Sequence, residues 1–196
     1  RVASFLGAGA YLHHIPTAIS ALASRGEFLT AYTPYQPEIS QGTLQALYEF
    51  QTMVAELFGM EIANASTYDG ASAVAEAILM AHRITGRRGV AVARSVHPEY
   101  RQVARTYASQ VGLKFGEIPA SESGTVDMAQ ATSAISGETA CLVVQYPNFF
   151  GGIEELEALA DAVWRLEPAA VGLSVMVPVL DADPRVLFAG YSRAVG

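Results

Sequence analysis

Residues 89–119 read GVAVARSVHPEYRQVARTYASQVGLKFGEIP, and the hydrophobic period changes twice within them. The run GVAVA predicts a short buried strand, and PEYRQVARTYASQVG has the spacing of an amphipathic helix. The run LKFGEIP then returns to the alternation of a strand. A strand, a helix and a second strand in this order predict a right-handed crossover between two parallel strands.

The same alternation continues on both sides of this stretch. Helices are predicted over residues 43–60, 70–86, 126–136 and 154–168, and further strands over residues 140–147 and 169–177. Because parallel strands joined by helices need cover on both faces, we expect an α/β domain of three layers with a mostly parallel sheet. Residues 1–42 are expected to form a loop-rich arm that packs on the domain, and residues 43–196 to be an incomplete α/β large domain.

Composition limits the function classes. The 196 residues are 51% hydrophobic, which is typical of a globular protein, and the longest apolar runs are shorter than the ~20 residues that span a bilayer. A net charge of −7 without a basic run disfavours binding to nucleic acid or to a membrane surface. The single Cys141 excludes a disulfide within the chain, so we expect a reducing cytoplasm. Because the chain starts at Arg1, we interpret it as a fragment of a longer protein.

One candidate site precedes the helix predicted from residue 70. Ser66, Tyr68, Asp69 and Gly70 follow a strand-like run and lie at the head of this alanine-rich helix, a geometry that presents free N–H groups to an anion such as phosphate. Asp69 and Ser66 are also typical helix caps, and the Asp69 carboxylate would repel a phosphate. We therefore favour the capping interpretation and regard the turn as a degenerate phosphate site.

Further polar residues follow predicted strands, at the edge where open α/β folds bind ligands. Ser95 and His97 come after the first of these strands, and His97 has a ring that can stack on a cofactor or carry a proton. The alternative is that His97 and Pro98 only cap the next helix, and the sequence favours neither reading. Asn148 occupies the same kind of position after another strand, where turn chemistry alone would explain it.

Several motifs are absent, and their absence is informative. The chain has no glycine-rich dinucleotide motif, Walker loop, nucleophile elbow or zinc spacing. His13 and His14 are adjacent, so their side chains diverge and no metal site is expected from them. The only lysine, Lys114, is predicted to be an exposed strand residue. Covalent chemistry that needs an amine would therefore have to use a lysine from elsewhere.

The arm contains an unusual stretch, TAYTPYQPEISQG, at residues 30–42. Its two prolines stiffen the chain, and its tyrosines, glutamines and glutamate offer rigid rings and hydrogen bonds. Such a loop suits an interface, either as plain packing or as part of a substrate cleft.

Five segments together resemble one family, the first (alpha) subunit of the two-subunit glycine dehydrogenase (decarboxylating), which is the P-protein of the glycine cleavage system. The resemblance runs from about residue 4 to about residue 165. It rests on FLGAGAYLHHIP (5–16), GEFLTAYTPYQPEISQGTLQALYEFQTMVAELFGM (26–60), NASTYDGASAVAEA (64–77), SVHPEYR (95–101) and VVQYPNFFGGIEEL (143–156).

This resemblance implies a large domain of the fold-type I pyridoxal-phosphate enzymes. It also implies a heterotetramer in which a beta subunit of related fold carries the lysine that binds pyridoxal phosphate. In this family glycine is decarboxylated, and its aminomethyl group passes to the lipoyl arm of the H-protein. The chain would be inactive alone and would complete the partner's cleft with Tyr32, Tyr35, Gln36, Glu38, Gln41, His14 and His97.

Two alternatives stay open: a non-catalytic assembly half of a pyridoxal-phosphate enzyme, or another fold-type I enzyme. The sequence after about residue 165 departs from the family pattern, and Asp181 to Pro184 form only a distorted echo of the acidic turn expected there.

Overall fold

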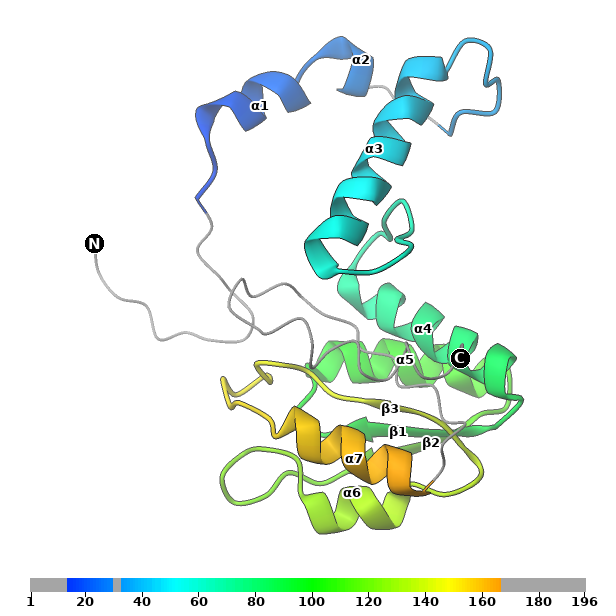
Figure 1. Ribbon diagram of the computed structural model, residues 1–196, viewed down its shortest axis with the longest axis vertical. Coiled ribbons are helices and arrows are strands. Elements are labelled where there is room, and N and C mark those ends of the chain that lie inside the picture. The colour runs from blue at the N-terminus through cyan, green and yellow to red at the C-terminus, as the bar shows by residue number, and fades with distance from the viewer. Residues whose placement is uncertain (1–13, 30–32, 167–196) are drawn as a thin grey trace. The chain divides into compact units, whose positions relative to one another are not determined.

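The computed structural model describes residues 14–29 and 33–166 (Figure 1). His13, Tyr32, the strand predicted over residues 169–177 and the turn at Asp181 to Pro184 lie outside the described residues. Contacts between residues divide the chain into two compact units, one of residues 10–66 and one that contains residues 67–196. The sequence-based boundary at residue 42 falls inside the first of these units and stays a prediction.

In the described part of the first unit the structure is helical. The short helices α1 (Thr17–Ala23) and α2 (Gly26–Leu29) precede α3 (Gln41–Phe58), which corresponds to the helix predicted over residues 43–60. Helix α3 ends at Gly59, whose φ of 64° is the left-handed conformation that glycine adopts without strain. Gln51 Nε2 donates to the carbonyl of Ala63, which ties the following loop back to the helix.

The second unit contains the predicted alternation of helices and strands. Three parallel strands, β1 (Gly89–Ala93), β2 (Lys114–Ile118) and β3 (Thr139–Val143), form a sheet of order β2-β1-β3. The helices in the described part of this unit are α4 (Gly70–Thr85), α5 (Pro98–Gln110), α6 (Met128–Ala134) and α7 (Leu156–Leu166). The α/β class predicted from the sequence is confirmed for these residues.

The helices cover both faces of the sheet. Figure 1 shows α4 and α5 on one side of the strands and α6 and α7 on the other, and each of these pairs is in contact. The chain moves outward from β1 to β2 through α5 and then returns past β1 to β3 through α6. Since right-handed crossovers in opposite directions place their helices on opposite faces, this strand order explains the three layers.

The core lies between the sheet and α4 and α5. Small residues, among them Ala75, Ala104 and Ala108, are fully buried and let the two helices approach each other and the strands closely. Larger apolar side chains such as Ile78, Val92 and Ile118 fill the space between them. Over the residues described, none of the helices is both long and apolar enough to cross a membrane.

Candidate functional site at the carboxyl edge of the sheet

Strands β2 and β3 lie on opposite sides of β1, so the strand order reverses at β1. In open α/β sheets, ligands bind outside the carboxyl ends of the strands at such a reversal. Ser95 and His97 follow β1, and Gln145 and Asn148 follow β3, so the loops after the two neighbouring strands meet at this edge. The candidate site is therefore the edge formed by these loops.

A buried carboxylate joins the loops. Glu154 is 4% exposed, and its Oε1 accepts hydrogen bonds of 2.8 Å from Ser95 Oγ and from Asn148 Nδ2. Its Oε2 accepts from the backbone N–H of Val126 at 2.7 Å. A buried carboxylate is costly unless its oxygens are hydrogen-bonded, and here both are. Glu154 thus fastens the loops after β1, β2 and β3 to one another.

Asn148 extends this network. Its side chain is 2% exposed, and Nδ2 also donates to the carbonyl of Gly124, while Oδ1 accepts from the N–H groups of Phe150 and Gly152. The sequence suggested that turn chemistry alone could account for Asn148. The turn is present, but the same amide also reaches two other loops.

His97 has two kinds of contact. Its Nδ1 accepts from the N–H of Glu99, and α5 begins at Pro98, so the capping interpretation is confirmed. The ring also lies 5.0 Å from the ring of Tyr100 and 4.9 Å from that of Phe149, between centroids. The backbone N–H of His97 donates to Gln145 Oε1, which connects the loops after β1 and β3. The predicted stacking of His97 on a cofactor stays a prediction.

The head of α4 is filled by the protein's own side chains. Asp69 is the cap, and its carboxylate accepts a 2.8 Å hydrogen bond from the N–H of Ser72, as the capping interpretation predicted. A side chain at Gly70 would collide with the ring of Tyr100, whose Cζ lies 2.7 Å from the position of an added Cβ. Tyr68 is fully exposed, and Ser66 has a φ of 99°, with its N–H donating to Asn64 Oδ1. A negative charge and an aromatic ring therefore occupy the place that an anion would need.

The arm residues are exposed in their own unit. His14, Tyr35, Gln36, Glu38 and Gln41 all present their side chains to solvent there, with Tyr35 76% exposed. Glu38 and Gln41 lie together at a groove of about 820 Å³ along α3, which is lined by Pro37, Glu38, Gln41, Leu44, Gln45, Tyr48, Glu49, Thr52 and Met53. The structure thus brings two of the predicted arm residues to one concave surface.

Lys114 is the first residue of β2, and its side chain is exposed, as predicted. In a parallel sheet this amino end lies opposite the carboxyl edge that carries His97 and Asn148. Lys114 is therefore at the wrong end of the strands to react with a ligand at the candidate site.

A sequence model of the family described as glycine cleavage system P-protein matches residues 1–179. The chain belongs to this family. The P-protein match reaches beyond residue 165, up to which the sequence resemblance was traced.

Individual members of this family also match the chain. It is 56% identical over 187 residues to a probable glycine dehydrogenase (decarboxylating) subunit 1 of Koribacter versatilis, covering 91% of this chain and 42% of the relative. It is 58% identical over 155 residues to the protein of the same name from Thermotoga maritima, covering 79% and 35%. The chain thus spans less than half the length of these curated relatives.

Solved structures identify the fold. A crystal structure of glycine decarboxylase (P-protein) of the glycine cleavage system in inhibitor-bound form is 50% identical, with a TM-score of 0.79, and the match covers 92% of this chain and 38% of that one. A NifS-like protein has the same fold at 13% identity, with a TM-score of 0.63 over 81% of this chain and 44% of that one. The second unit is therefore an incomplete large domain of the fold-type I pyridoxal-phosphate enzymes.

Pyridoxal phosphate, which this fold implies, does not fit the residues at the head of α4. A phosphate at the head of α4 would meet the Asp69 carboxylate and the Tyr100 ring, and none of the 196 residues except Lys114 is a lysine.

Sequence reasoning found His97 and Asn148 but missed Glu154. An acidic residue at the start of an apparent amphipathic helix is typical of an exposed first turn, so its pattern gave no sign of burial. The only available signal was the glycine pair at 151–152, which indicated a sharp turn that could fold Glu154 back toward the sheet.

Proposed function

We propose that this chain is part of subunit 1 of a glycine dehydrogenase (decarboxylating) and works together with a beta subunit of related fold. The complete enzyme would decarboxylate glycine and pass the aminomethyl group to the lipoyl group of an H-protein. The names of the relatives and the family match support this activity. We further propose that the enzyme is a cytoplasmic heterotetramer.

In this proposal the beta subunit binds pyridoxal phosphate and supplies the reactive lysine. One observation carries this division of labour: Asp69 and Tyr100 fill the head of α4, where a phosphate would otherwise meet free N–H groups. The sequence adds that Lys114, at the amino end of β2, is the only lysine available.

The role proposed for this chain is to complete the cleft of its partner. Tyr35, Gln36, Glu38 and Gln41 are exposed and follow stiff proline turns, so they would present rings, amides and a carboxylate at little cost in entropy. His14, and Tyr32 outside the described residues, belong to the same proposed set. His97 would contribute its ring from the carboxyl edge, with its backbone held by Gln145 and its ring by the hydrogen bond from the N–H of Glu99.

The experiment combines the complete chain with its beta subunit, pyridoxal phosphate and glycine, and follows co-elution and the exchange of labelled carbon dioxide into glycine. We expect exchange only when both subunits are present. Tyr35→Ala, Gln36→Ala and His97→Ala should preserve co-elution and reduce exchange about tenfold or more. Gln102→Ala, at an exposed glutamine on α5, is the matched control for Gln36→Ala and should leave exchange unchanged.

A second candidate function is a non-catalytic assembly half. The exposed side chains of the arm would then only bind the partner. In that case the three variants would weaken co-elution or leave exchange unchanged. Exchange by this chain alone would contradict both functions.

A further inference from the structure

Three arginines gather around one carboxylate beside the candidate site. Glu117 on β2 lies 3.6 Å from Arg94 Nε, 3.1 Å from Arg101 Nη1 and 2.6 Å from Arg105 Nη2. Within the described ranges, Glu117 is the only carboxylate that pairs with these guanidinium groups. We call Arg94, Arg101 and Arg105 the arginine cluster.

The cluster keeps excess positive charge at the surface. Three guanidinium groups and one carboxylate leave a formal charge of about +2, in a chain whose total is −7. Arg94 is 62% exposed and Arg105 57% exposed, whereas Glu117 is only 22% exposed. The guanidinium groups carry about five N–H donors each, so many more donors face solvent than Glu117 can occupy.

The arginines are held in position rather than free in solution. Arg101 Nε donates to the carbonyl of Val96 at 3.0 Å, and its side chain is 20% exposed. The guanidinium carbon of Arg105 lies 5.1 Å from the centre of the Phe115 ring, a cation–π contact. Side chains fixed in this way lose less entropy when they bind a carboxylate than free arginines would.

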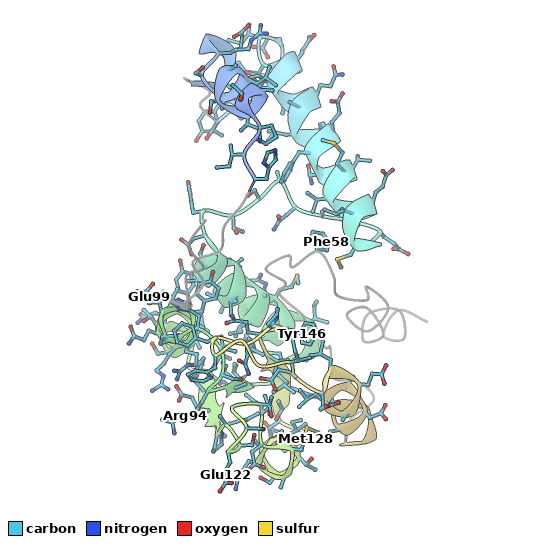
Figure 2. All side chains as sticks on the ribbon, turned by 90° about the vertical axis from the view of Figure 1, so that its left-hand side faces the viewer. Phe58, Arg94, Glu99, Glu122, Met128 and Tyr146 are labelled. Carbon is cyan, nitrogen blue, oxygen red and sulfur yellow. The ribbon has the colours of Figure 1, made fainter. Side chains whose placement is uncertain are left out.

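The location of the cluster connects it to the site. Arg94 follows β1 directly, and Arg101 binds the carbonyl of Val96, the residue before His97. In Figure 2, Arg94 points outward from the unit, and Glu99 and Glu122 are labelled on either side of it. Neither of these carboxylates forms an ion pair with the cluster, so neither cancels its excess charge by direct contact.

We propose that the arginine cluster is a docking surface for a carboxylate-rich segment of a partner protein. Planar guanidinium groups match carboxylates through paired hydrogen bonds, and the net charge of −7 disfavours acidic partners that do not reach this positive surface. The partner would dock beside the loops that carry Ser95 and His97. This proposal does not depend on the proposed function, because it requires neither cofactor nor glycine.

The test uses the complete chain and a fluorescent peptide of ten glutamates. Binding is followed by fluorescence anisotropy at low salt, and it should weaken as salt rises. We expect Arg94→Gln/Arg105→Gln to weaken binding about tenfold. The pair Arg83→Gln/Arg88→Gln, which removes the same charge from other exposed positions, should leave it within about twofold. Arg94→Lys/Arg105→Lys, which keeps the charge but loses the paired hydrogen bonds, should bind with an affinity between those of the unmodified protein and the Arg94→Gln/Arg105→Gln pair.

Three results would overturn the proposal. The first is no binding of the peptide to the unmodified protein, and the second is equal weakening in both glutamine pairs, which would indicate bulk electrostatics. The third is inorganic phosphate binding the cluster as tightly as the peptide, which would indicate a small-anion site. Thermal unfolding of each variant serves as the folding control, and the exposure of Arg94 and Arg105 predicts no change in it.

Discussion

Ser95 and Glu154 are 59 positions apart in the sequence, yet Ser95 Oγ donates a 2.8 Å hydrogen bond to Glu154 Oε1 inside the protein. The bond joins the loop after β1 to the segment before α7. Together with the bonds from Asn148 and Val126, it makes one carboxylate the common anchor of the carboxyl edge.

Replacing Glu154 with glutamine should therefore be costly, although the two side chains have the same shape. Both carboxylate oxygens accept hydrogen bonds, so an amide NH2 must face either Val126 N–H or the donors of Ser95 and Asn148. We expect Glu154→Gln to lower the free energy of unfolding by about 2–3 kcal/mol, measured by chemical denaturation. Ser95→Ala removes one donor and leaves the others, so it should cost less. Equal stability of Glu154→Gln and the unmodified protein would contradict the anchor role.

The contact between Gly70 and Tyr100 predicts that Gly70→Ala has opposite effects on stability with and without the Tyr100 ring. An added Cβ at Gly70 would overlap the Tyr100 ring, so Gly70→Ala should destabilise the protein by about 1 kcal/mol. In a Tyr100→Ala background the same change should become stabilising, because alanine is favoured in a helix. Gly42→Ala on α3 is the control, since a Cβ there meets nothing within 4 Å and should stabilise. Thermal unfolding of the four variants checks the prediction, and a destabilising Gly70→Ala in both backgrounds would contradict it.

The contribution of the Asp69 cap to stability should come from its hydrogen bond and not from its charge. Asp69→Ala should cost about 1 kcal/mol because the N–H of Ser72 loses its acceptor. Asp69→Ser keeps a capping oxygen without the charge and should stay close to the unmodified protein in chemical denaturation. Asp127→Ala, at the cap of α6, is the matched variant for Asp69→Ala. One oxygen of the Asp127 carboxylate accepts from the N–H groups of Ala129 and Gln130. A loss in Asp69→Ser as large as that in Asp69→Ala would show that charge, rather than the hydrogen bond, matters.

Cys141 predicts a loss of stability in alkali. Its thiol is buried in β3, and this burial raises its pKa from 9.0 to about 12. Because the folded-state pKa is the higher one, the contribution of this group to stability is complete below about pH 9 and is lost as the pH rises toward about 12. The pH dependence of unfolding should be shallower in Cys141→Ala over this window.

A thiol reagent provides a second readout for Cys141. At pH 8 it should modify the unfolded protein within minutes and the folded protein far more slowly, because the folded thiol is both buried and neutral. Rapid modification of the folded protein would contradict the burial.

The order of helices and strands was predictable because it depends on local periodicity. The strand at GVAVA, the helix from Pro98 and the cap at Asp69 all follow from residues within a few positions of one another. The start of α7 was predicted two residues too early, at Glu154 instead of Leu156. Glu154 is held outside the helix by partners 28 and 59 positions away, which periodicity does not report.

The candidate site was predictable only in part for the same reason. Residues that follow strands, such as His97 and Asn148, can be placed at the carboxyl edge once the sheet is known to be parallel. The ring of Tyr100 over Gly70 and the convergence of three arginines on Glu117 depend on packing between α4, α5 and β2. No spacing in the sequence encodes such contacts.

The position of Glu154 also has a consequence for synthesis on the ribosome. Glu154 is made after Ser95, Val126 and Asn148, and it follows Ser95 by 59 residues. At a synthesis rate of about 5–20 residues per second, Glu154 is made on the order of seconds after the loop that follows β1. Strands β1 and β2 are complete during this interval, whereas the loops at their carboxyl ends are not yet fastened. The loops at the carboxyl edge are therefore fastened only after the three described strands have been made, and a nascent-chain chaperone would find this edge open until then.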